Sequence, residues 1–161
     1  MPFTLIDDKL MNEVTAAAQN NSRRRSSYAF HRSNQESLQR LVSVFEPDTY
    51  VRPHKHTDGD KVEVFIPLRG KFVLVTFADD GRVAEHVVLE AGETSPWGAE
   101  VPPGTWHTII ALAPDTAVYR VGSGPWTEQA HKQYPTWAPQ EEDGEAGQAF
   151  VARVRQELML Y

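Results

Sequence analysis

The chain has 161 residues, of which 40% are hydrophobic and 24% charged, and these proportions are typical of one soluble globular domain. Its net charge of −6 argues against a nucleic-acid-binding protein, because such proteins present a broad basic surface to the phosphate backbone. The absence of cysteine excludes disulfides, thiolate metal sites and a cysteine nucleophile.

The N-terminal region predicts one short amphipathic helix that begins at Asp7 or Asp8 and ends near residues 20–21. Its apolar residues recur at three- and four-residue spacing, at Leu10, Met11, Val14, Ala17 and Ala18. The N-terminus lacks a basic region followed by an apolar one, and no later run approaches the roughly 20 apolar residues that a membrane span needs. We therefore predict a cytoplasmic protein without a membrane partner.

Residues 26–124 have the pattern of an all-β structure. Short runs rich in Val, Ile, Phe, Tyr and Thr alternate with turn residues, and no stretch of helical periodicity interrupts them. Asp79, Asp80 and Gly81 form a hairpin turn between two of the runs. This rhythm predicts a sandwich or barrel and disfavours a parallel sheet with crossover helices. The expected strands are residues 27–31, 38–45, 49–54, 62–69, 71–78, 82–89, 94–101, 106–112 and 116–122.

The C-terminal region changes composition after Gly124 to Pro, Trp, Gly and acidic residues, which predicts an extended wrap. Residues 145–161 then carry apolar side chains at helical spacing and predict a terminal helix that docks on the sheets. We expect a single domain with an N-terminal helical segment (1–25), a β-barrel core (26–124), and an extended wrap with a C-terminal helix (125–161).

Two histidines one residue apart, His54 and His56, lie at the end of the expected strand 49–54. Side chains two apart on a strand share a face, so Arg52 and both imidazoles would point the same way. Such a pair is a natural chelate for a metal, but by itself it is a weak signal, because most imidazoles are simply hydrogen-bonded.

A third histidine, His107, follows a rigid Pro-Pro-Gly turn in the stretch VPPGTWHTII. With Glu63 as an oxygen donor, the three imidazoles would make a site of three nitrogens and one oxygen. That donor set suits iron, manganese, zinc, nickel or copper better than calcium or magnesium.

These residues resemble the two motifs of the cupin superfamily. The first is written as HxH, a short gap, E, six residues and G, and it corresponds here to His54, His56, Glu63 and Gly70. The second is PxG, two residues and H, and it corresponds to the stretch that ends at His107. The resemblance implies one metal held by the three histidines and the glutamate.

Two departures from the cupin motifs stand out. The second motif often ends in asparagine, where this chain has Ala111, and the gap between His56 and Glu63 is longer than usual. Asp60 lies nearer the usual count and stays an alternative fourth ligand. We favour Glu63, because its spacing to Gly70 matches and it begins an apolar strand, whereas TDGD is typical of a turn.

More narrowly, the chain resembles the WbuC-type cupin-fold metalloproteins over nearly its whole length. The resemblance rests on the stretches SSYAFHRS, TYVRPHKH, EVFIPLRGKFVLVTFADDGRV, EVPPGTWHTIIAL and YPTWAP. It implies a double-stranded β-helix (cupin, or jelly-roll) barrel holding one divalent metal (Zn, Fe, Mn or Ni), often encoded near bacterial genes for surface polysaccharide. The resemblance does not imply any established reaction.

Several side chains near the expected metal are candidates for substrate chemistry. Arg52 would pair with a substrate carboxylate or phosphate, or with a surface acid. His31 would serve as an acid–base group, or as a core histidine bonded to the backbone. Tyr28 and Trp97 would line the pocket or belong to the core, whereas Trp106 has the opposite parity to His107 and should face away.

Three functions remain open at this point. The first is a metal-dependent enzyme acting on a small polar molecule such as a sugar or sugar nucleotide, with isomerase-like or oxygenase-like chemistry. The second is a non-catalytic metal-containing module that binds a small ligand, and the third is a metal-free sugar epimerase or isomerase. In each case the partner is a small molecule, and pairing into a homodimer would cover an exposed strand edge.

Overall fold

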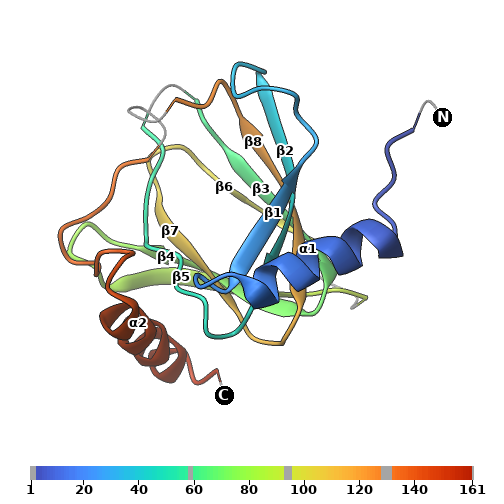
Figure 1. Ribbon diagram of the computed structural model, residues 1–161. Helices are drawn as coiled ribbons and strands as arrows, with labels where there is room; N and C mark the ends of the chain where they lie inside the picture. Colours follow the sequence, from blue (N-terminus) through green and yellow to red (C-terminus); the bar gives the residue numbers. More distant parts are fainter. Residues whose placement is uncertain (1–2, 58–59, 93–95, 128–131, 161) are drawn as a thin grey trace.

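The computed structural model describes residues 3–57, 60–92, 96–127 and 132–160, which form two antiparallel sheets with one helix near each end (Figure 1). The larger sheet has the strand order β1-β2-β8-β3-β6 and the smaller one β5-β4-β7. The predicted all-β jelly-roll fold with two terminal helices is confirmed. The elements are α1 (Asp8–Asn20), β1 (Arg25–Ala29), β2 (Leu38–Phe45), β3 (Glu63–Arg69), β4 (Lys71–Phe77), β5 (Val83–Glu90), β6 (Ala99–Val101), β7 (Trp106–Ala111), β8 (Thr116–Ser123) and α2 (Gly144–Glu157).

The first helix, α1, lies across the outer side of β1 and β2 (Figure 1). Asp7 is the N-cap, and its carboxylate accepts a hydrogen bond from the N–H of Leu10 at 3.0 Å. Leu10, Val14 and Ala18 are buried against apolar residues of β2 and β8. Neither helix in the described part of the chain has the length and apolar character needed to cross a membrane.

The segment 49–54, expected as a strand, is not one. It is extended, but its pairing is limited to isolated bridges, His54 with His107 and the adjacent Lys55 with Gln133. Pro53 has no N–H to donate to a ladder, and the N–H of Thr49 is already bonded to the carbonyl of Glu46 in a turn. The expectation that Arg52, His54 and His56 share one face of a strand is therefore wrong, although the two histidines still converge.

The other expected strands are present with small changes at their ends. β1 begins two residues earlier than expected, at Arg25, and ends at Ala29, so that His31 lies beyond it. The expected strand 94–101 is observed only as Ala99–Val101, and residues 93–95 lie outside the described residues. An apolar core of Phe45, Phe65, Phe72, Leu74, Leu89 and Ile109 fills the space between the sheets.

The second helix, α2, covers the outer face of the smaller sheet. Asp143 caps it, and Phe150, Val151 and Val154 pack on residues of β4 and β7 and on Tyr50. Gly147 lies so close to Tyr50 that an added Cβ would stand 2.4 Å from Cδ1 of the ring. A larger residue at this position would force the buried ring or the helix to move.

Gly147→Ala is expected to lower the free energy of unfolding by about 1–2 kcal/mol, because overpacking against Tyr50 outweighs the gain in helix propensity. Gly144→Ala is the matched control in the same helix, since nothing lies within 4 Å of the Cβ it would add. Denaturant unfolding of both variants measures the difference. Equal stability of the two variants would contradict the packing described here.

Candidate metal centre and its cavity

Backbone pairing joins the two segments that carry the histidines. The N–H of His54 donates to the carbonyl of His107 at 3.1 Å, and the N–H of His107 donates to the carbonyl of His54 at 2.9 Å. The N–H of Gly104, whose φ of 73° favours glycine, donates to the carbonyl of His56 at 2.8 Å. Main-chain bonds from Gly104 of the Pro-Pro-Gly turn and from His107 after it therefore position the backbone that carries all three imidazoles.

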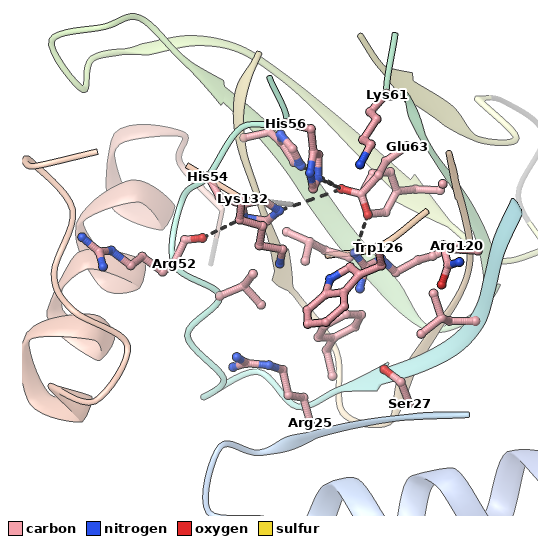
Figure 2. A pocket seen from close by; sticks show the side chains of 18 of the residues that line it. Arg25, Ser27, Arg52, His54, His56, Lys61, Glu63, Arg120, Trp126 and Lys132 are labelled. Carbon is pink, nitrogen blue, oxygen red and sulfur yellow. Dashed lines mark hydrogen bonds and ion pairs between the residues drawn. The ribbon is translucent and has the colours of Figure 1, made fainter. Parts of the chain in front are cut away.

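Glu63 completes a buried group of four potential ligands. It is the first residue of β3, where its neighbours across the sheet are Gly122 of β8 and Val101 of β6. Its Oε2 lies 3.0 Å from Nε2 of both His56 and His107 and 3.9 Å from Nε2 of His54 (Figure 2). One ligand atom from each of the four residues falls within 4.8 Å of the others. The side chains that the two motifs predict are thus brought together.

Two of the imidazoles are held in the tautomer that a metal ligand needs. Nδ1 of His54 lies 3.0 Å from the carbonyl oxygen of Arg52, and Nδ1 of His107 lies 2.8 Å from that of Thr105. A carbonyl oxygen only accepts, so Nδ1 carries the proton in both rings and Nε2 keeps its lone pair. Those lone pairs are on the nitrogens closest to Glu63.

The fit of a cation to this group follows from the same contacts. A neutral imidazole with its proton on Nδ1 presents a lone pair to the carboxylate oxygen, and the two would repel unless a cation lies between them. Nε2 of His54 is buried and has no hydrogen-bond partner among the described residues. A divalent metal would accept all three nitrogens and the carboxylate oxygen, so the residues fit such an ion.

The charge states of Glu63 and His54 agree with this arrangement. Burial raises the pKa of Glu63 and the guanidinium of Arg120 lowers it, and the balance holds that pKa well below its usual range. Burial lowers the pKa of His54 far below its usual value, and Lys132 and His107 add to the shift. An ionised carboxylate and a neutral imidazole are the forms in which these groups bind metals.

Arg120 fixes the orientation of the carboxylate. Its Nη2 donates to Oε1 of Glu63 at 2.6 Å, and its guanidinium lies 5.4 Å from the ring centre of Phe65. In the β3–β8 register Arg120 stands opposite Phe65, two residues along the sheet from Glu63. Since Oε1 is held by Arg120, Oε2 is the oxygen that faces the imidazoles.

A cavity of about 800 Å³ opens beside the four ligands. Its lining comes from β1, β2, β3, β7 and β8, from the segment that precedes β3 and from the segment that follows β8. Lys132 of that segment projects into it, and burial together with Arg120 and Arg25 lowers the pKa of its ammonium to about 8, against the opposing effects of Glu63 and Glu141. Figure 2 shows Lys132 between the imidazoles and Arg25. A molecule in this cavity would lie next to the candidate metal ligands.

His31 and Arg52 both line the cavity but are held by other parts of the chain. Nδ1 of His31 accepts the N–H of Arg40 at 3.1 Å. The guanidinium of Arg52 donates to Gln140 Oε1 at 2.5 Å and to the carbonyl of Pro135 at 3.1 Å, and it lies over the ring of Tyr134. Figure 2 shows it turned away from Glu63 and towards the C-terminal segment.

The three aromatic candidates lie outside the cavity. Arg25, Ser26 and Ser27 of β1 line it, whereas Tyr28 does not; Tyr28 is 42% exposed and packs against Phe30. The contact of Tyr28 with substrate therefore stays a prediction that the lining of this cavity does not support. Trp97 is 65% exposed, and Trp106 faces away from the ligands, as its parity predicted, with its indole N–H bonded to Asp79.

Asp60, the alternative fourth ligand, is exposed and does not belong to the buried group. The loop that lengthens the motif includes residues 58–59, which lie outside the described residues. Four further residues that line the cavity were not predicted from the sequence: Lys61, Arg120, Trp126 and Lys132. Arg120 reaches Glu63 through strand pairing and Lys132 comes near His54 through the path of the chain after β8, and neither leaves a local sequence signal.

Comparison with solved structures places the fold among the cupins. The capsular polysaccharide assembling protein CapF from Staphylococcus aureus matches with a TM-score of 0.56 and 18% identity, over 68% of this chain and 30% of CapF. CapF with the inhibitor 3-isopropenyl-tropolone matches with a TM-score of 0.56 and 19% identity, over 72% of this chain and 33% of CapF. Oxalate decarboxylase from Bacillus subtilis matches with a TM-score of 0.52 and 17% identity, over 68% of this chain and 27% of the enzyme.

These likenesses show the cupin fold, and the chain spans only about a third of the length of the proteins concerned. A family model described as a domain of unknown function (DUF6016) matches residues 6–89, which include His54, His56 and Glu63. No curated protein matches the sequence.

Glu63→Gln is expected to weaken zinc binding by at least about 100-fold, because it replaces the anionic ligand by a neutral amide. Asp60→Asn is the matched control, and its affinity should stay within about twofold of the unmodified protein, because exposed charges contribute little. Competition with a chromophoric chelator measures both constants. If Asp60→Asn loses zinc and Glu63→Gln keeps it, Asp60 is the ligand instead.

Proposed function

This chain belongs to the DUF6016 family, and we propose that it is a metal-dependent cupin enzyme that acts on a small polar molecule such as a sugar or sugar nucleotide. The observation that carries the proposal is the convergence of His54, His56, His107 and Glu63 beside a cavity large enough for such a molecule. The proposed ion is one divalent transition metal, Zn, Fe, Mn or Ni, which the three-nitrogen, one-oxygen donor set suits.

In this proposal the ion, when bound, acts as a Lewis acid on a carbonyl, hydroxyl or water oxygen. The protein's own residues set the conditions for that chemistry. Burial keeps the imidazole of His54 neutral, and Arg120 keeps Glu63 ionised and turned so that Oε2 faces the three nitrogens. The Nδ1 contacts of His54 and His107 with backbone carbonyls fix both rings in place.

His31 is the proposed proton-transfer group. It lines the same cavity, and its Nδ1 lies 3.1 Å from the backbone nitrogen and 3.2 Å from the carbonyl oxygen of Arg40, which leaves Nε2 as the ring nitrogen available to a substrate. A group that both gives and takes a proton at the substrate is what distinguishes an enzyme from a module that only binds its ligand.

The biological setting is also part of the proposal. The resemblance to WbuC-type proteins suggests surface polysaccharide metabolism, and CapF, which shares the cupin fold, is described as a capsular polysaccharide assembling protein. A single domain, a cytoplasmic location and pairing into a homodimer belong to the same proposal.

Protein purified without an affinity tag should contain about one equivalent of a transition metal per chain. Removing the metal with a chelator should lower the melting temperature by about 5–10 °C, because the ion binds only the folded state. Adding the same metal back should restore the melting temperature. Elemental analysis and thermal unfolding measure both effects. Protein without stoichiometric metal, whose stability does not change on chelation, would favour the metal-free epimerase or isomerase.

His31→Ala is expected to keep its metal and to lose turnover by about 10²- to 10⁴-fold, because it removes a proton-transfer group and no ligand. Turnover would be followed by NMR on a panel of sugars and sugar phosphates, with the metal content of each sample measured. His86→Ala is the matched control, since His86 is exposed on β5. Unchanged turnover in His31→Ala would exclude this role and favour a binding module.

A further inference from the structure

The cavity beside the candidate metal ligands is strongly basic in an acidic protein. Six basic residues line it, and its two carboxylates are Glu63 and Glu141, so the lining has an excess of four positive charges, whereas the whole chain carries −6. The basic residues are Arg23, Arg25, Arg52, Lys61, Arg120 and Lys132. Charge of one sign concentrated in a concave site attracts ions of the other sign.

Both carboxylates in the lining already have partners. Glu141 forms ion pairs with Arg23 and Arg25, and Glu63 accepts from Arg120 and faces the imidazoles. The two carboxylates are therefore committed to other groups and leave part of the positive charge uncompensated.

Lys132 is the clearest case of an uncompensated charge. The structure gives its ammonium no hydrogen bond and no ion pair with any described residue. The residue is partly buried in the lining of the cavity, near Arg25 and Arg120, and lies among the side chains that Figure 2 draws around the cavity. An ammonium that lies near two guanidinium groups and has no partner of opposite charge destabilises a fold, and an apolar residue of similar length would avoid that cost. An anion in the cavity would supply the missing partner.

The rest of the lining suits a ligand with hydroxyl groups. Ser27, Ser123 and Asn34 contribute polar atoms, and Trp126 and Tyr134 contribute aromatic rings. A volume of about 800 Å³ accommodates a monosaccharide with one charged substituent.

We propose that the cavity binds a polyhydroxylated anion whose carboxylate or phosphate contacts Lys132, while the rest of the molecule lies against the metal ligands. The inference rests on the proposed function and deepens it, because it assigns the substrate to the anionic sugars. The sequence predicted that Arg52 would contact an anionic group of the substrate. Because the guanidinium of Arg52 is bonded to the C-terminal segment, we assign this contact to Lys132 instead.

Three ligands that differ only at C6 provide the test: glucose, glucuronate and glucose 6-phosphate. Isothermal titration of the metal-loaded protein should show at least one of the two anions binding 10-fold or more tightly than glucose, because a charge-assisted contact is added. Tighter binding of glucuronate identifies a carboxylate subsite, and tighter binding of glucose 6-phosphate a phosphate subsite.

Lys132→Met should weaken binding of the preferred anion by about 10- to 100-fold and leave glucose unchanged. Lys9→Met removes the same charge from an exposed position on α1 and should bind all three ligands like the unmodified protein. Lys132→Arg should keep most of the affinity. Without ligand, Lys132→Met should melt at the same temperature as the unmodified protein or higher, which separates lost binding from lost folding.

The inference is overturned if the unmodified protein binds neither anion more tightly than glucose, or if Lys132→Met binds the anions as well as the unmodified protein does. These results are distinct from failure of the proposed function. Metal analysis of the same samples decides whether the centre is loaded, and Lys132 is not among its ligands. A metal-loaded protein without anion preference contradicts this inference alone, and a metal-free protein with anion preference contradicts the proposed function alone.

Discussion

Two backbone hydrogen bonds between His54 and His107 join chain segments that lie far apart in the sequence, and the candidate metal centre depends on them. They hold the extended segment 49–54, which belongs to neither sheet, against the first residues of β7. Pro53 prevents a longer run of strand pairing at this place. The Gly104–His56 bond extends the pairing by one more contact. Because the backbone sets the positions of the imidazoles, the site does not depend on side-chain packing alone, and ligands held in this way lose little conformational entropy on binding an ion.

A second constraint is the balance of charge around the buried carboxylate of Glu63. Burial alone would favour its neutral form, and the guanidinium of Arg120 opposes that preference. Together with burial, the guanidinium of Arg120, which favours the ionised form of Glu63, also lowers the pKa of Lys132. The carboxylate and the basic cavity are thus electrostatically coupled, so that a change at Arg120 would affect both the candidate ligand and the region in which we place the substrate anion. A bound metal would add further positive charge and strengthen the attraction for an anion.

Much of this arrangement is encoded in local sequence patterns. The spacing of His54, His56, Glu63 and His107, with the Pro-Pro-Gly turn, predicts the four residues that converge, and the alternation of apolar residues predicts most of the strands. The rest depends on non-local contacts. Arg120 reaches Glu63 only because β8 pairs with β3, and Lys132 enters the cavity only because the chain after β8 returns across it. The parity argument for Arg52 rested on a strand that does not form at residues 49–54, although Arg52 still lines the cavity with the two histidines.

The central claim is that three imidazoles and one carboxylate share a single ion. X-ray absorption at the K-edge of the metal retained by untagged protein tests it most directly, because the spectrum reports the number and kind of ligands around the ion. The account predicts scattering from three imidazole rings together with a carboxylate oxygen, at distances of about 2.0–2.2 Å. A stoichiometric metal whose spectrum lacks imidazole scattering, or shows an all-oxygen shell, would contradict it.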